Sequence, residues 1–148
     1  MRTTYRVLAW TVAAGVVWQA AGVGWAFFSV LLEVEDGAVV TTGYDWGGNA
    51  GIMMHRIGGM GLIPLACLAL LVVSFFTQVA GAVRWALIVL GLFVVQFGLV
   101  VAAFETAAAG ALHGANALVL FAAAVWAGHR VRRVDPQPSD RALDRTAA

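Results

Sequence analysis

The sequence predicts an all-α integral membrane protein: an up-down-up-down four-helix bundle with both termini on the cytoplasmic side. Of its 148 residues, 61% are hydrophobic and only 11% are charged, whereas a soluble domain carries about 25% charged residues. The charges are grouped, so that four long runs contain no Asp, Glu, Lys or Arg: 7–32, 57–83, 85–104 and 106–128. Each run is long enough for a helix to cross the membrane core, which takes about 20 residues.

Each run defines one element, and together they form one transmembrane domain at 1–133. Helices are expected at about 6–32, 50–76, 84–105 and 110–131, with an outer loop at 33–49. The first apolar run is too long for a typical signal peptide, so we expect an uncleaved helix. Pro64 should kink the second helix, because proline cannot donate the helical hydrogen bond. The polar segment 134–148 contains two prolines and is expected to be a disordered cytoplasmic tail. No internal repeat is evident.

The arginines give the orientation. All nine basic residues are Arg, and with four crossings eight of them fall on one side: Arg2, Arg6, Arg84, Arg130, Arg132, Arg133, Arg141 and Arg145. Excess arginine marks the cytoplasmic side of a membrane. The use of Arg instead of Lys, together with abundant Ala, Gly and Val, points to a GC-rich bacterial genome. We therefore expect a multi-pass protein of the bacterial cytoplasmic (inner) membrane. The net charge of +1 and the absence of a basic stripe give no reason to expect nucleic acid as a partner.

Two histidines lie inside apolar segments, His55 in the second expected helix and His113 in the fourth. Ionisable residues at membrane depth are costly and mark functional sites. Both helices should run from outside to inside, with each histidine about one turn below the outer surface. In an up-down-up-down bundle these helices are diagonal partners. The two imidazoles are therefore expected to face each other, an arrangement that can ligate a haem iron from both sides.

The neighbours of these histidines complete the predicted cofactor site. Gly58 and Gly59 share a helix face with His55, and Gly110 lies one turn before His113, so these small residues could shape a slot for a flat ring. Arg56 could pair with a haem propionate. Plainer roles are open to the same residues: the glycines could serve only close helix packing, and Arg56 could serve only to anchor the outer interface.

Three further polar groups could act at or near the site. Asn116 could hydrogen-bond a partner imidazole, a propionate or a neighbouring helix. Glu105, at the outer end of the third expected helix, is a weak candidate for catalysis or for a further metal ligand, and its plainer role is in the solvated turn. His129 suits the cytoplasmic end of the fourth helix and is expected not to be a ligand. Zinc is disfavoured as the metal because it prefers four ligands.

The stretch His55-Arg56-Ile57-Gly58-Gly59 resembles the histidine-arginine motif in the second helix of a four-helix half of heme A synthase. The second histidine of that half would correspond to His113, within residues 112–117. The resemblance is best over the second to fourth helices and implies one bundle with a histidine pair. The family has a glutamate three residues before the first histidine, whereas this chain has Ile52. The resemblance therefore implies ligation of haem b more than synthesis of heme A.

Two main functions follow, and a third is weaker. The first is a small b-type haem protein for electron transfer or haem handling, with quinone or a membrane redox complex as a partner. The second is an accessory or assembly subunit without a cofactor, whose glycine-rich helices pack into an oligomer or a larger membrane complex among the lipids. An oxidoreductase acting on haem or quinone would need an acid–base group, and only Glu105 is available from a membrane helix.

Overall fold

The computed structural model describes residues 1–130 and is all-helical in the elements it forms there. The expected tail at 134–148 lies outside the described residues. The helices are α1 (Arg2–Glu35), α2 (Ala50–Ile57), the π-helix η1 (Gly58–Leu62), α3 (Ile63–Ser74), α4 (Ala82–Ala103) and α5 (Ala107–His129). Together α2, η1 and α3 form one continuous span, so residues 1–130 contain four helical spans long and apolar enough to cross a membrane. This composition indicates a multi-pass membrane protein.

Local signals explain where several helices begin and end. The Asn49 side chain accepts a hydrogen bond from the backbone N–H of Ile52 at 3.1 Å and caps the start of α2. Thr106 caps α5 in the same way through the backbone N–H of Ala108. After α1 the chain turns at Gly37, whose φ of 96° is a conformation that favours glycine.

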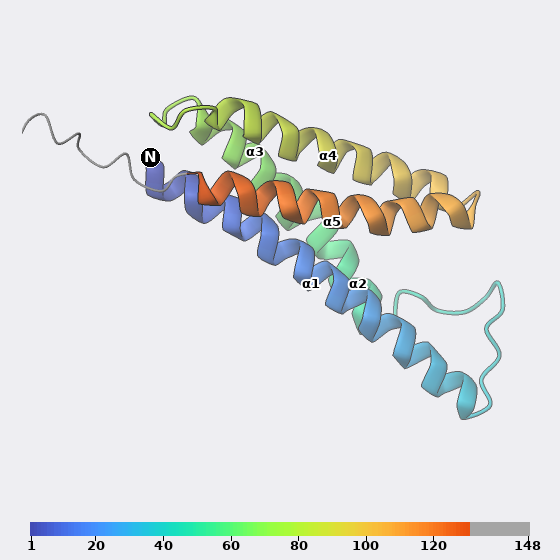
Figure 1. The fold of residues 1–148 in the computed structure, drawn as a ribbon. Coiled ribbons are helices and arrows are strands. Elements are labelled where there is room, and N and C mark those ends of the chain that lie inside the picture. Colours follow the sequence, from blue (N-terminus) through green and yellow to red (C-terminus); the bar gives the residue numbers. More distant parts are fainter. Residues whose placement is uncertain (131–148) are drawn as a thin grey trace, which may run out of the picture.

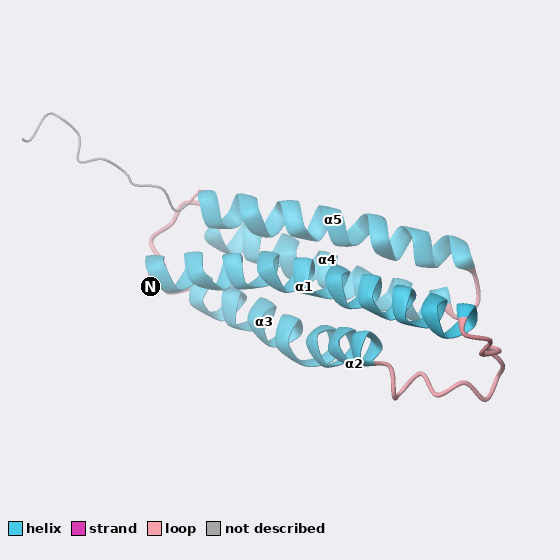
Figure 2. Cartoon of the chain, turned by 90° about the horizontal axis from the view of Figure 1, so that it is seen from below, coloured by secondary structure: helices cyan, strands magenta, loops and turns pink. Residues whose placement is uncertain are grey.

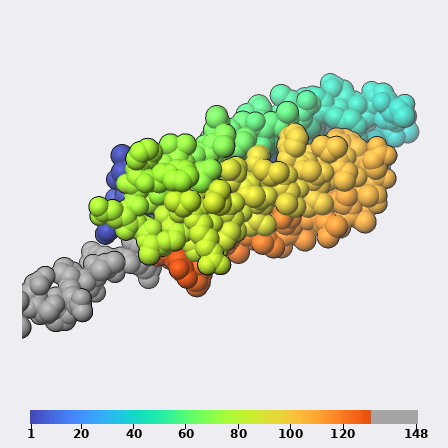
Figure 3. All heavy atoms as spheres, turned by 90° about the horizontal axis from the view of Figure 1, so that it is seen from above, coloured from blue at the N-terminus to red at the C-terminus, as the bar shows by residue number. Residues whose placement is uncertain are grey.

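The four spans occupy the corners of a square. Going round it, α1 packs against α3, α3 against α4, α4 against α5, and α5 against α1 (Figure 1). The α2–α3 span and α5 are therefore diagonal partners. The start of α1, the α3–α4 connection and the end of α5 lie at one end of the molecule, which we call the terminal end (Figure 1). Figure 3 shows the cyan loop after α1 and the orange turn between α4 and α5 together at the other end, the loop end.

The apolar core fills only the terminal half of this square. Its largest fully buried side chains include Tyr5, Val12, Leu70, Val89 and Leu120, one or two from each span. Towards the loop end, α2 packs along α1 (Figure 2), and among the described residues its backbone does not come close to that of α4 or α5. The α1–α2 pair thus diverges from the α4–α5 pair (Figure 1). Side chains from the two helix pairs that meet in this region must extend across the increasing distance between the helix backbones.

The loop between α1 and α2 is held by contacts with α1. The Tyr44 hydroxyl donates to a Glu33 carboxylate oxygen at 2.8 Å, and this hydrogen bond raises the pKa of Tyr44. The Asn49 side chain also donates to the carbonyl of Ala26 at 3.4 Å. The long-range polar contacts of this loop therefore run to α1.

Candidate functional site

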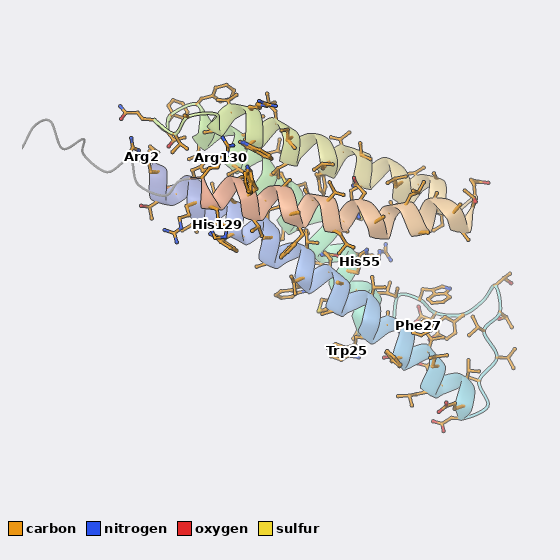
Figure 4. The ribbon with its side chains drawn as sticks, in the orientation of Figure 1. Arg2, Trp25, Phe27, His55, His129 and Arg130 are labelled. Carbon is orange, nitrogen blue, oxygen red and sulfur yellow. The ribbon has the colours of Figure 1, made fainter. Side chains whose placement is uncertain are left out.

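The structure brings the two predicted histidines together. The ring centroids of His55 on α2 and His113 on α5 lie 6.2 Å apart, with an angle of 65° between the ring planes. Both side chains are half-buried. In Figure 4, His55 lies on the side of α2 nearest α5, whereas Arg2, His129 and Arg130 gather at the terminal end. The pair is located where the apolar core stops and the two helix pairs begin to diverge.

A helical irregularity turns His55 into the bundle. On α3, Ile63, Ala66 and Leu70 face the core. Continued backwards as a regular α-helix, that face would reach Arg56 rather than His55, given 3.6 residues per turn. The π-helix η1 adds one residue to the turn, which shifts the inward face by one position. As a result His55 is half-buried and Arg56 is exposed.

The widened turn has a sequence cause. It ends at Leu62, just before Pro64 at the start of α3. Proline has no N–H to donate and its ring clashes with the carbonyl four residues earlier, so the regular ladder is broken at this point. Where the sequence predicts a proline kink, the structure has a π-helical turn between His55 and Pro64.

Gln96 on the neighbouring helix α4 makes two contacts with His113, which together we call the Gln96 clamp. The Nδ1 atom of His113 lies 3.1 Å from the backbone carbonyl oxygen of Gln96 on α4. In return the Gln96 side-chain amide donates to the backbone carbonyl of His113 at 2.9 Å. An acceptor at Nδ1 fixes the tautomer in which Nδ1 carries the proton and Nε2 offers its lone pair.

The same clamp recurs at His55 with Gln19 on α1. The Nδ1 atom of His55 lies 3.3 Å from the backbone carbonyl oxygen of Gln19. When the Gln19 amide oxygen accepts from the N–H of Gly59 at 2.9 Å, the amide nitrogen lies 2.7 Å from both the backbone carbonyl oxygen and the Nδ1 atom of His55. Two hairpins, α1–α2 and α4–α5, therefore each hold one imidazole through a glutamine, but only His55 has a side-chain amide beside its Nδ1. Neither Nε2 atom has a hydrogen-bond partner within residues 1–130.

The other predicted site residues have identifiable neighbours. The Gln19 amide occupies the space that a side chain at Gly58 would need, so Gly58 and Gly59 accommodate Gln19. Gly110 faces Ala103 across the α4–α5 contact, where an added Cβ would be 3.8 Å from that side chain. Asn116 donates to the Leu92 carbonyl at 3.0 Å and to the Gln96 side-chain oxygen at 2.6 Å. Of the roles left open for Asn116, contact with a neighbouring helix is therefore the observed one.

The charged candidates stand apart from the pair. Arg56 and Glu105 are exposed, and neither makes a side-chain hydrogen bond in the described part of the chain. His129 packs edge-on against Trp10, with ring centroids 5.1 Å apart, at the far end of α5. Within residues 1–130 no group of three or more His, Cys, Asp or Glu side chains could hold a metal. The candidate site is thus a pair of imidazoles without a third protein ligand.

Sequence reasoning missed Gln19 and Gln96. Each is a polar residue in a charge-free span, and polar groups at membrane depth need partners. The need of each glutamine for a hydrogen-bond partner was therefore a signal in the sequence. The identity of the partner could not be predicted, because each glutamine meets its histidine on the adjacent helix.

The centroid separation of the pair matches that of two imidazoles with one metal ion between them. With metal–nitrogen bonds of about 2.0 to 2.1 Å, two imidazoles on opposite sides of a metal have ring centres about 6 Å apart. The observed separation of 6.2 Å falls at this value. Hydrogen bonds at the opposite ring nitrogen are the usual support of a metal-binding histidine.

No family model, curated protein or solved structure matches this chain. The four apolar spans define a multi-pass helical membrane protein, and its described residues bring two histidines together between diagonal spans. The resemblance to a heme A synthase half remains a prediction carried by the residues around His55 and His113.

If the Gln96 clamp holds α4 to α5, replacing it should weaken the bundle. We expect Gln96→Leu to lower the free energy of unfolding by about 1 kcal/mol, because interhelical hydrogen bonds in membranes are worth about 0.6 kcal/mol each on average. Denaturation of the detergent-solubilised protein, followed by circular dichroism, measures the change. Phe97→Leu, at an exposed position on the same helix, is the matched control. Equal stability of the two variants would contradict a stabilising clamp.

Proposed function

We propose that this chain is a small membrane b-type haem protein in which His55 and His113 are the two axial ligands. The observation that carries the proposal is the imidazole pair: centroids 6.2 Å apart on diagonal spans, with both Nδ1 atoms held by backbone carbonyls. With Nδ1 bound to a carbonyl, the Nε2 of each ring is the nitrogen available to bind a metal.

The donor set fits haem better than a bare metal ion. A porphyrin supplies four nitrogens in a plane, so the protein needs to add only two axial ligands. A structural zinc ion would need four ligands from the protein, and the described residues offer no third ligand beside the pair. Arg56, exposed one residue after His55, is available to pair with a propionate at the outer interface.

The proposed topology is up-down-up-down with both termini inside a bacterial cytoplasmic membrane. In the described part of the chain, Arg2, Arg6, Arg84 and Arg130 belong to the terminal end. The acidic residues belong to the loop end: Glu33, Glu35, Asp36, Asp45 and Glu105. Under the positive-inside rule the terminal end is cytoplasmic, and the histidine pair lies in the outer half of the membrane.

Haem held by two histidines supplies one-electron redox chemistry, and with both axial positions filled it favours electron transfer. The residues of the chain would hold the rings in place and limit access of water. A quinone or a membrane redox complex is the proposed exchange partner.

The alternative is an accessory or assembly subunit without a cofactor. It is favoured by the same clamps, because a histidine whose Nδ1 binds a neighbouring backbone carbonyl also ties two helices together. The two functions differ in one property, which is the binding of haem.

Absorption spectra of the detergent-purified protein test the proposal. We expect the wild type, after hemin addition, to give the sharp reduced α-band of six-coordinate haem at one haem per chain. His55→Ala and His113→Ala should both lose that band. His129→Ala should keep it, because His129 is at the opposite end of the bundle. A wild-type protein that binds no hemin, or a normal α-band in either site variant, would overturn the proposal.

A further inference from the structure

We infer that the two histidines are unequal ligands: His113 is fixed, and His55 is releasable. This inference rests on the proposed function and deepens it. Release of His55 would open one coordination position on the α2 side of the site, where a small neutral molecule such as carbon monoxide could bind. A purely electron-transferring pair has no need of such an asymmetry.

His113 belongs to a closed hydrogen-bond network. Its partner Gln96 is itself held, because the Gln96 side-chain oxygen accepts from Asn116 at 2.6 Å. Asn116 is anchored in turn to the Leu92 carbonyl on α4 at 3.0 Å. Each member of this network restrains the next, and α5 is a regular helix throughout. Moving His113 would therefore break several interhelical hydrogen bonds together.

The contacts of His55 are weaker than those of His113, and they allow a second tautomer of its ring. Its Nδ1 lies 3.3 Å from the Gln19 carbonyl, at the long end of the range for a hydrogen bond. The side-chain amide nitrogen of the same Gln19 lies 2.7 Å from Nδ1. An amide N–H donated to Nδ1 would move the ring proton to Nε2, and a protonated Nε2 cannot bind a metal. Gln19 therefore supports both a ligating and a non-ligating tautomer of His55.

The backbone next to His55 is the irregular part of the span. Directly after it come the π-helical turn and three glycines, Gly58, Gly59 and Gly61. Glycine loses more conformational freedom on ordering than other residues, and π-helical turns often occur at functional sites. Relaxation of η1 to a regular helical turn would rotate α2 and carry His55 away from the pair. No comparable irregularity occurs beside His113.

Release of His55 is a simple ligand exchange. His55 would keep on Nε2 the electron pair that it had shared with the metal. A small neutral molecule such as carbon monoxide would supply an electron pair in its place. No oxidation or reduction is involved, and no proton needs to move until Nε2 takes one from its surroundings.

The unloaded protein gives the first test, independent of haem binding. The chain has three histidines, so ring-nitrogen NMR signals of ¹⁵N-histidine protein can be assigned with single His→Ala variants. At pH 8 we expect His113 to show only the Nδ1-protonated tautomer and His55 to show a mixture. Gln19→Leu, which removes the competing amide, should shift His55 to the Nδ1-protonated tautomer. A single Nδ1-protonated form for both rings in the wild type would overturn the inference.

The haem-loaded protein gives the second test. We expect His55→Ala to retain haem as a five-coordinate, high-spin species, and His113→Ala to bind hemin at least about tenfold more weakly than His55→Ala. Reduced wild type should bind carbon monoxide with a shifted Soret band, and Gln19→Leu should bind it at least about tenfold more weakly. Gln78→Leu, a substitution at an exposed glutamine at the terminal end, is the matched control.

The outcomes distinguish a failure of the unequal-ligand inference from a failure of the proposed function on which it rests. If the wild type binds no hemin, the proposed function fails. If hemin binds with six-coordinate spectra, but both histidine variants lose it equally and carbon monoxide does not bind, the proposed function stands and the unequal-ligand inference fails.

Discussion

Inserting one alanine after Gly61 is expected to abolish the six-coordinate haem spectrum. The insertion adds one residue between α2 and α3, next to the π-helical turn η1, so the position eight residues before Ile63 passes from His55 to Arg56. Each residue corresponds to about 100° of rotation, which would turn His55 out of the bundle and Arg56 inward. We expect hemin affinity to fall by at least about 100-fold, measured by titration of the purified protein and followed at the Soret band.

Gly61→Ala is the matched control. It keeps the residue count, and a Cβ at this position would meet nothing within 4 Å. We therefore expect normal hemin binding from Gly61→Ala. Circular dichroism and gel filtration of the insertion variant would show that it still folds as a helical protein of the same size. A six-coordinate spectrum in a folded insertion variant would show that the helix register is not what positions His55.

Replacing Gly51 by alanine should have the largest effect on stability. Gly51 packs directly against the α1 backbone: an added Cβ would overlap the amide nitrogen of Ala26 and lie 2.5 Å from the carbonyl oxygen of Gly22. Backbone atoms cannot move aside as a flexible side chain can, so α2 would have to move away from α1. We expect a loss of about 1–3 kcal/mol in the free energy of unfolding, the usual cost of overpacking.

Thermal or denaturant unfolding in detergent measures this loss. Gly98→Ala is the control, because an added Cβ there would meet nothing within 4 Å, and alanine favours helix over glycine. We expect Gly98→Ala to be as stable as the wild type or slightly more stable. Because Gly51 is one turn before His55, Gly51→Ala should also weaken hemin binding. Wild-type stability in Gly51→Ala would mean that α1 and α2 are not in close contact.

The four spans and the two histidines could be predicted from the sequence. Long charge-free runs leave helix as the available structure at membrane depth, because each backbone polar group must find a partner within its own segment. The predicted helix limits differ from the structure mainly at the ends, as with α1, which begins at Arg2 and continues to Glu35. The roles of Gln19 and Gln96 could not be predicted, because both depend on contacts between separate helices.

The glycines near His55 show where sequence reasoning lost precision. Gly58 and Gly59 share a helix face with His55, and their small size predicts a slot for a ring. The structure uses that space for the Gln19 amide, which contacts the backbone of the widened turn. Small residues indicate that something approaches closely, but they do not specify what approaches.

The sequence by itself determined that this protein is helical, that four segments can cross a membrane, and that two imidazoles are available within them. These properties follow from local composition and from the cost of leaving backbone groups unpaired in lipid. Only the tertiary structure decided that His55, rather than Arg56, faces the bundle, and that each imidazole is held by a glutamine on the next helix. Helix register and interhelical contacts depend on how whole helices pack, and both α2 and the widened turn before Pro64 pack against α1.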